Sequence, residues 1–163
     1  MDDVLRAMRE DDLDAVLAVQ AACYPPAMCE AAAVLLARLR AAPATTLLAC
    51  DAQGVCGYLF AYPARLGKVT PLGAAFEIPE APDALYLHDL AVAPRAHGLG
   101  LARRLAGRML ELGAARGLAQ SALVSVQDSR RFWEALGYAA APGADPAALA
   151  SYPADAVYMT RLP

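Results

Sequence analysis

The segment Leu90–Ala102, which reads LAVAPRAHGLGLA, constrains the fold of this chain more than any other part of its sequence. Its apolar first half predicts a strand, and an apolar-periodic helix is expected to follow over residues 98–116. A helix that begins this way leaves several backbone N–H groups unpaired at the end where its dipole favours negative charge. Gly98 and Gly100 let the backbone approach a ligand closely. The segment therefore predicts a strand-turn-helix unit that can cradle a pyrophosphate.

Two other interpretations of this turn remain open from the residues alone. Glycines in a strand-to-helix turn can simply ease packing, without any ligand. The turn is also partly similar to a dinucleotide-binding fingerprint, but Arg103 stands in place of the third glycine and Gln120 in place of the ribose-binding acid. Arg95 and His97 add side-chain donors beside the turn, which favours an anionic ligand.

The rest of the chain predicts a mixed α/β sheet. Apolar periodicity, together with proline and glycine stops, sets the element boundaries. The predicted strands are residues 4–8, 45–50, 55–61, 85–92, 118–126, a strand that opens at 137–138, and 157–162; the predicted helices are one that follows Asp11 and Asp12, and residues 30–41, 98–116 and 129–136. Residues 62–84 are expected to form a long irregular loop, of the kind that is often functional. The sequence has no internal repeat and no low-complexity linker, so residues 1–163 are expected to form a single domain.

The glycine turn also carries a family resemblance. Arg95, Gly98 and Gly100 resemble the R/Q-x-x-G-x-G/A signature of the GCN5-related N-acetyltransferase (GNAT) family, and the preceding Leu-Ala-Val strand is similar to that family's. The resemblance extends over nearly the whole chain through the order of the elements. It implies a single-domain α/β GNAT fold, in which helices flank a mixed, mostly antiparallel sheet with one splayed parallel strand pair. That pair would be residues 85–92 and 118–126, and acetyl-CoA, the implied cosubstrate, would enter the cleft between them.

The resemblance also implies how the cosubstrate is held. The backbones of Leu90 and Val92 would pair with the pantetheine arm, and the amides of residues 97–102 would hold the pyrophosphate. The cofactor-binding residues implied in this way are Leu90, Ala91, Val92, Arg95, Ala96, His97, Gly98, Leu99, Gly100, Leu101, Ala102, Ser129, Phe132 and Trp133.

A second segment, residues 132–138, resembles the family's F-Y-x-x-x-G-F motif with one departure. The family tyrosine that often protonates the departing CoA thiolate is replaced by Trp133. An indole N–H is a donor without useful acidity, so Trp133 is expected to line the cofactor channel instead. Ser129 is the candidate partner for the thiol, although a role as helix N-cap accounts for it equally well.

The strand at residues 85–90 carries the candidate base. Acyl transfer needs a neutral amine, and a base must take the proton that an alkyl amine carries at neutral pH. The tract is similar to the H-L-H-x-L-A-V strand of arylalkylamine N-acetyltransferases, with His88 on the second histidine and Tyr86 replacing the first. His88 is therefore the candidate base and Tyr86 its water-holding or substrate-lining partner; a strand histidine bonded to a neighbouring carbonyl is the alternative. Strand alternation predicts Asp89 on the opposite face, where it either orients a neighbour or is solvated beyond the sheet.

The acceptor amine is expected near the first two helices, the turn at Tyr24-Pro25-Pro26 and the loop of residues 62–84. Glu77, Glu80 and Asp83 in that loop would attract a cationic amine, although ordinary solvated charges explain them equally well.

Composition narrows the classes of partner. The net charge of −3 argues against nucleic acid, and no apolar run approaches the roughly 18 residues that span a bilayer. The acidic start Met1-Asp2-Asp3 lacks the layout of a secretory signal, so a cytoplasmic protein is expected. We expect no membrane partner and no metal, and a homodimer remains open.

The four cysteines form two pairs, Cys23 with Cys29 and Cys50 with Cys56, each with five intervening residues. Structural zinc sites usually have tighter pairs, so reduced and mostly buried thiols are expected. Cys50 and Cys56 flank the predicted turn at residues 51–54, and a contact between them across the hairpin is one arrangement that the sequence allows.

Two functional hypotheses follow. The leading one is an N-acetyltransferase that moves an acetyl group from acetyl-CoA to a primary amine of a small molecule or peptide. Direct attack in a ternary complex is expected, because neither motif contains a cysteine. The alternative is a non-catalytic acyl-CoA-binding or sensing domain, which the tryptophan at position 133 keeps open.

Overall fold

The computed structural model describes residues 4–163, so the acidic start Met1-Asp2-Asp3 lies outside the described residues. The main elements are β1 (Val4–Ala7), α1 (Leu13–Cys23), α2 (Ala32–Ala41), β2 (Thr46–Asp51), β3 (Gly54–Ala64), β4 (Ala84–Val92), α3 (Leu101–Ala115), β5 (Ser121–Ser125), α4 (Arg130–Ala135), β6 (Ala139–Ala140), α5 (Pro146–Leu149) and β7 (Val157–Arg161). Their order confirms the sequence-based prediction except for α5. Asp145 caps this short helix by accepting a hydrogen bond from the Ala147 N–H at 3.1 Å.

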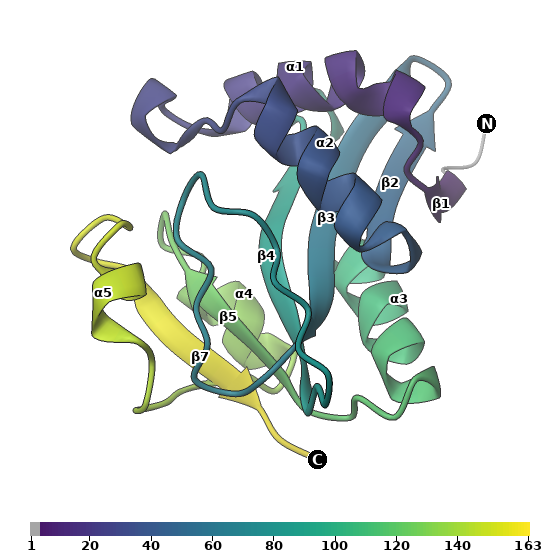
Figure 1. The fold of residues 1–163 in the computed structure, drawn as a ribbon. Helices are drawn as coiled ribbons and strands as arrows, with labels where there is room; N and C mark the ends of the chain where they lie inside the picture. The colour runs from purple at the N-terminus through teal and green to yellow at the C-terminus, as the bar shows by residue number, and fades with distance from the viewer. Residues whose placement is uncertain (1–3) are drawn as a thin grey trace.

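The strands form one seven-stranded sheet in the order β1-β2-β3-β4-β5-β7-β6 (Figure 1). Among the strands of residues 4–163, only β4 and β5 pair in parallel; the other neighbouring strands are antiparallel. The parallel register runs from Leu85 opposite Ser121 to Leu87 opposite Leu123, and β4 then continues to Val92 without this neighbour. The predicted mixed, mostly antiparallel sheet with a splayed parallel pair is therefore confirmed.

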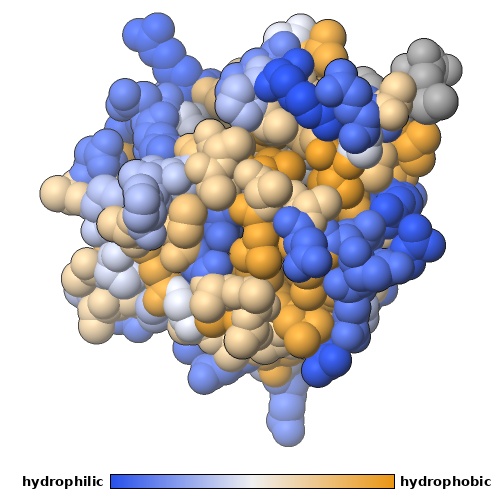
Figure 2. All heavy atoms as spheres, turned by 90° about the horizontal axis from the view of Figure 1, so that it is seen from above, coloured by the Kyte–Doolittle hydropathy of each residue, from blue (hydrophilic) through white to orange (hydrophobic). Residues whose placement is uncertain are grey.

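Helices cover both faces of the sheet and create two buried clusters. α1 and α2 supply Val16, Val19, Leu35 and Leu39 to one cluster. α3 supplies Leu101, Leu105 and Met109 to the other, at spacings that place them on one helix face, as the sequence predicted. Seen from the end that carries α1 and α2, the surface has a hydrophilic patch recessed among hydrophobic residues near its centre (Figure 2). None of the helices in residues 4–163 has both the length and the apolar character needed to cross a membrane.

A β-bulge in β4 changes which face its side chains occupy. Across the β3–β4 pair, Asp89 lies opposite Phe60 and Leu87 lies opposite Ala61, so His88 is the extra residue. A bulge interrupts the two-residue alternation of a strand. As predicted, Tyr86 and His88 lie on the same face, with ring centroids 6.2 Å apart.

The prediction that Asp89 lies on the face opposite His88 is wrong, and so is the alternative in which its carboxylate is solvated beyond the sheet. Its carboxylate is buried and accepts a hydrogen bond from Tyr58, a residue of the core cluster that α1 and α2 cover. The prediction assumed strict alternation, which the bulge at His88 breaks.

The suggested contact between Cys50 and Cys56 is also wrong. Cys50 packs against the cluster under α1 and α2, whereas Cys56 belongs to the cluster under α3. A register shift between Ala49 and Cys50 places Cys50 opposite Val55 instead of Cys56. The described residues contain no disulfide.

Candidate active site

The separation of β4 from β5 opens a cavity of about 250 Å³. One wall is β4 from Leu87 to Val92, and the other is β5 together with the turn that follows it. The far side is closed by Ser129, which directly precedes α4, and by Trp133, which lies within α4. The cleft therefore lies where the sequence predicted it.

The backbone of β4 presents an unpaired edge to this cleft. The Ala93 N–H donates to the Cys56 carbonyl of β3 at 2.8 Å, so alternation turns the amides of Val92 and Leu90 toward β5. The Val92 carbonyl accepts from His97 Nε2 at 2.8 Å, and the Leu90 carbonyl lies 3.1 Å from Tyr24 Oη. The N–H groups of Leu90 and Val92 are the donors that remain on this edge for an extended ligand.

The glycine turn borders an adjoining cavity of about 320 Å³ at the start of α3. Gly98 and Gly100 have φ angles of +81° and +75°, which side-chain-bearing residues rarely adopt. No atom lies within 4 Å of the position that a Cβ would occupy on either glycine, so the space above both is open. This geometry fits a phosphate cradle at a helix N-terminus.

Of the two arginines near the turn, Arg103 lines the cavity and Arg95 does not. The Arg95 guanidinium points toward the β2–β3 turn, where it pairs with Asp51 at 2.6 Å and donates to the Val55 carbonyl. Arg103, in the first turn of α3, lines the cavity together with His97. From the sequence, position 103 was considered only as a missing glycine. The position of Arg103 in the first turn of a predicted helix was an overlooked signal for a side chain that faces the cavity.

Residues at α4 form the opposite wall. Ser129 Oγ donates to the Val126 carbonyl at 2.7 Å and shares a hydrogen bond with Ser125 Oγ at 3.0 Å, so it occupies the N-cap position without capping the helix. Trp133 lines the cleft and is packed edge-on between the rings of Phe132 and Tyr138. Phe132 itself faces the cavity at the glycine turn.

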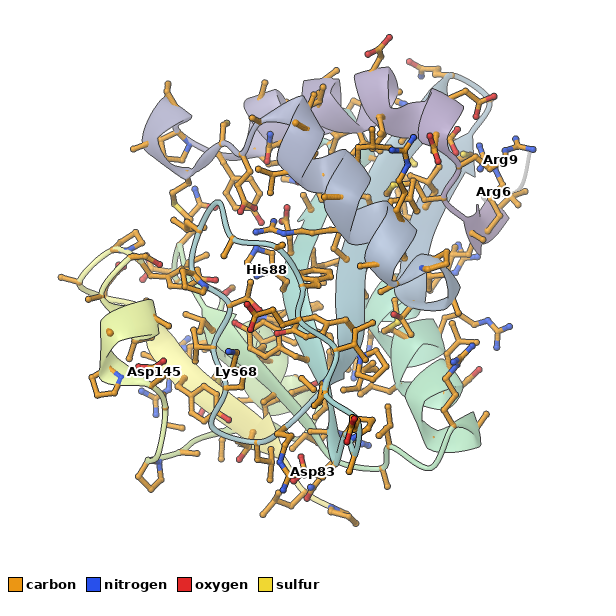
Figure 3. All side chains as sticks on the ribbon, in the orientation of Figure 1. Arg6, Arg9, Lys68, Asp83, His88 and Asp145 are labelled. Atoms are coloured by element: carbon orange, nitrogen blue, oxygen red, sulfur yellow. The ribbon has the colours of Figure 1, made fainter. Side chains whose placement is uncertain are left out.

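His88 lies at the centre of the molecule, between β4 and the segments that cover it (Figure 3). Its side chain is only 1% exposed, with Nε2 3.3 Å from Glu30 Oε1 and Nδ1 3.4 Å from Tyr152 Oη. Tyr152 Oη donates its own hydrogen to the Thr70 carbonyl at 2.6 Å. Both neighbours of the ring can therefore accept a hydrogen bond from it.

The carboxylate of Glu30 is held in its charged form. Burial favours protonation, but hydrogen bonds from His88 and Arg38 outweigh it and lower the pKa of Glu30 below its ordinary value. Arg38 contacts the two carboxylate oxygens at 2.7 and 2.6 Å, and the Gly73 N–H donates to Oε2 at 2.7 Å. Arg38 also donates twice to the Ala74 carbonyl, so one buried ion pair fixes the loop of residues 65–83 over the site.

A small cavity of about 30 Å³ adjoins the cleft beside His88. Glu30, His88, Asp89 and Tyr152 line it, and its volume and polar walls suit one water molecule. Tyr86 is buried next to His88 but lines neither this cavity nor the cleft.

Sequence reasoning missed Glu30, Arg38 and Tyr152 as parts of the site. Arg38 had a visible signal, because it falls between Leu35 and Leu39 on the apolar face of its predicted helix. Tyr152 had none, because it follows α5 in a segment without a recognisable motif. Among the predicted loop acids, Glu77 pairs with Lys68 and lines neither the cleft nor the small cavity beside His88. In the part of the chain that the structure describes, no group of three histidine, cysteine or acidic side chains is arranged to hold a metal ion.

Comparison with known proteins gives the following matches. The family model described as "Acetyltransferase (GNAT) family" matches residues 5–138. A comparison with curated proteins finds no match. Among solved structures, the GphF GNAT-like decarboxylase in complex with isobutyryl-CoA is 20% identical and has a TM-score of 0.80, with 97% of this chain and 98% of that chain covered.

Two further structures carry acetyltransferase functions in their names or ligands. Arabidopsis thaliana Naa50, bound to the bisubstrate analogue CoA-Ac-MVNAL, is 14% identical with a TM-score of 0.72, and 99% of each chain is covered. The ribosomal-protein-S18-alanine N-acetyltransferase from Escherichia coli is 14% identical with a TM-score of 0.69, covering 98% of this chain and 93% of that one. At these identities the likeness concerns the fold.

Proposed function

The chain belongs to the acetyltransferase (GNAT) family, and from that premise we propose that it transfers an acetyl group from acetyl-CoA to a primary amine. The acceptor is a small molecule or a peptide, and its amine attacks directly in a ternary complex. One observation carries the proposal: the cleft between β4 and β5 joins an open glycine turn at one end to a buried histidine at the other. An acyl-CoA bound along this cleft would have its phosphates at the glycine turn and its thioester near the histidine.

The residues present fit coenzyme A as the carrier of the acyl group. The N–H edge of Leu90 and Val92 suits the amide groups of a pantetheine arm. The open turn at Gly98 and Gly100 suits a pyrophosphate, with Arg103 beside it to compensate charge. Leu87, the last residue of β4 that pairs with β5, and Trp133 both line the cleft, and the acyl thioester would lie between them.

Substitution of Gly100 by valine should weaken CoA binding roughly 10- to 100-fold, which corresponds to the loss of one charge-assisted hydrogen bond. A β-branched side chain would enter the open space and would disfavour the φ of +75° that orients the turn. Isothermal titration calorimetry with CoA measures the effect. Gly107→Val is the matched control, because Gly107 lies in the middle of α3, away from the cavity. Unchanged affinity in a folded Gly100→Val protein would contradict the cradle.

In the proposed reaction His88 accepts the proton of the amine, through the water-sized cavity beside its ring. The neutral amine nitrogen then bonds to the thioester carbon, the C–S bond breaks, and the second proton that the nitrogen loses passes to the departing sulfur, so that CoA leaves as the thiol. The first proton taken from nitrogen is shared by His88 with Glu30 and Tyr152. Trp133 cannot protonate the departing sulfur. Ser129 contributes a hydroxyl to the wall of the cleft and is our candidate partner for the sulfur.

Direct attack is favoured over a covalent acetyl-enzyme. Cys23 lies close to β4, where its Sγ donates to the Val92 carbonyl at 3.2 Å. Burial raises the pKa of this thiol, and so does the nearby Asp89 charge. A thiol that resists ionisation is a poor nucleophile.

The charges at the site favour a cationic amine over an acyl group that carries a carboxylate, although the GphF structure is named a decarboxylase. Two buried carboxylates, Glu30 and Asp89, lie at the inner end of the cleft with a single arginine, Arg38. An acyl group that carries its own carboxylate would be repelled there, whereas a cationic amine would be attracted.

The proposal is tested by measuring free thiol released from acetyl-CoA with a panel of arylalkylamines, polyamines, amino acids and peptide N-termini. We expect release that depends on at least one of these amines. CoA binding without amine-dependent release from any of them would contradict the proposal and support a non-catalytic acyl-CoA-binding domain.

A further inference from the structure

We propose that Asp89 binds the ammonium group of the acceptor, at the point where the cleft meets the small cavity beside His88. This inference rests on the proposed function and names a residue that determines which acceptors it uses. The ligand class is an alkylammonium end, as found in a primary amine.

The bulge in β4 places Asp89 at this junction. Because His88 is the extra residue, Asp89 faces the same side of the sheet instead of the opposite one. Asp89, His88 and Tyr24 line both the cleft and the small cavity. An amine that reaches the thioester from the side of Tyr24 therefore passes the Asp89 carboxylate.

The carboxylate of Asp89 differs from the other buried acids in that no arginine pairs with it. Asp12 pairs with Arg6 at 2.8 Å, and Glu30 pairs with Arg38 at 2.6 Å. Among the ion pairs of residues 4–163, none joins Asp89 to a lysine or arginine. Burial raises the pKa of the Asp89 carboxyl, so a ligand that brings positive charge to this cavity would stabilise its charged form.

Two tyrosines fix the orientation of this carboxylate without neutralising it. Tyr24 Oη donates to Oδ1 at 2.8 Å, and Tyr58 Oη donates to Oδ2 at 2.9 Å. Each carboxylate oxygen can accept a further hydrogen bond. The nitrogens of His88 contact Glu30 and Tyr152, so the imidazole does not occupy these positions.

The size of the small cavity limits how much of the ligand reaches the junction. Val124 and Val126 from the β5 side and Met28 and Leu72 from the covering segments are apolar. The cavity of about 30 Å³ holds no more than one water molecule, so the methylene chain of the ligand would lie in the larger cleft and only its nitrogen would reach this junction. An ammonium bound to Asp89 would hold its remaining N–H groups toward the water-sized cavity and His88.

The test uses the full chain loaded with CoA and two probes of matched shape, n-butylammonium and 1-butanol, titrated by NMR chemical shifts. We expect the wild-type protein to bind the ammonium roughly 10- to 100-fold more tightly than the alcohol, as one charge-assisted hydrogen bond provides. Asp89→Asn should reduce this preference to less than about threefold, because an amide carries no charge. Asp14→Asn is the matched control: Asp14 is exposed in the first turn of α1, lines neither cavity and should keep the wild-type preference.

A measurement on the wild-type protein tests the inference even if the Asp89→Asn protein does not fold. The preference should persist between about 0.05 and 0.5 M salt, because buried charges are screened much less than exposed ones. A wild-type preference that disappears over this range, or a folded Asp89→Asn protein that retains it, would overturn the inference. Failure of the proposed function looks different: the ammonium would bind through Asp89, but no amine would be acetylated.

Discussion

Replacing His88 by alanine should lower kcat/KM roughly 10²–10⁴-fold, the usual contribution of a positioned base, while CoA affinity stays nearly unchanged. His88 is placed for this role because both of its ring nitrogens face acceptors, Glu30 and Tyr152. Steady-state kinetics give the loss of turnover, and calorimetry with CoA gives the control. The His88→Gln variant keeps much of the side-chain volume, so it separates the loss of the base from the cavity that alanine leaves beside Phe76 and Tyr86.

The pH profile distinguishes a base from a structural histidine. An imidazole must be neutral to accept a proton, and histidine ordinarily changes charge between about pH 5 and 8. In the wild-type enzyme kcat/KM should rise with pH through such an ionisation, and the variants should lack that limb. The amine also titrates, but its inflection moves when an amine of different basicity is used, whereas the enzyme's does not. A folded His88→Ala protein with full activity and an unchanged profile would contradict the role, and a water chain or Tyr86 would then replace His88 as the candidate.

Replacing Arg38 by methionine should destabilise the fold by about 3–5 kcal/mol, the cost of leaving a buried charge without its partner. The Arg38 guanidinium is 0% exposed and holds both the Glu30 carboxylate and the Ala74 carbonyl. Its loss should also free residues 65–83 to move. Denaturant unfolding measures the stability, and hydrogen exchange of the loop amides measures the local effect.

Arg40→Met is the matched control for this substitution. Arg40 is two residues away on the same helix, and its ion pair with Glu10 is exposed on both sides. Its removal should change stability little, because exposed pairs are screened by solvent. Equal effects of the two substitutions would mean that the buried pair does not stabilise the site.

Acid should weaken the same buried pair. The pKa of Glu30 is lowered in the folded protein relative to its ordinary value, which is about 4.3 for glutamate. A carboxylate of this kind contributes stability above its unfolded pKa, and the contribution is lost as pH falls through the folded pKa. The difference in stability between wild type and Arg38→Met should therefore be largest near neutral pH and should shrink in acid.

The fold could be predicted from sequence because its signals are local. Apolar periodicity located α3, and the two glycines located its start and the cradle beside it. The parallel pair and its splay followed from the resemblance that the same turn carries. None of these predictions required knowledge of which distant residues meet.

The composition of the site could not be predicted in the same way. The bulge at His88 moves Asp89 to the other face, and a strand with a bulge has no distinct signature in its own sequence. Glu30 and Tyr152 reach His88 from positions 58 and 64 residues away. Such contacts depend on how the loop of residues 65–83 and the segment after α5 fold over the sheet, which local periodicity does not encode.

Transfer of an acetyl group to nitrogen is the reaction that we assign to the cleft. The most direct test is mass spectrometry of the products formed from isotopically labelled acetyl-CoA and the amine panel. We expect labelled N-acetylated amine and free CoA in equal amounts, and we expect the yields of both products to fall together in His88→Ala. Labelled acetate as the product in place of the amide, or intact acetyl-CoA that stays bound in the presence of every amine, would contradict this assignment.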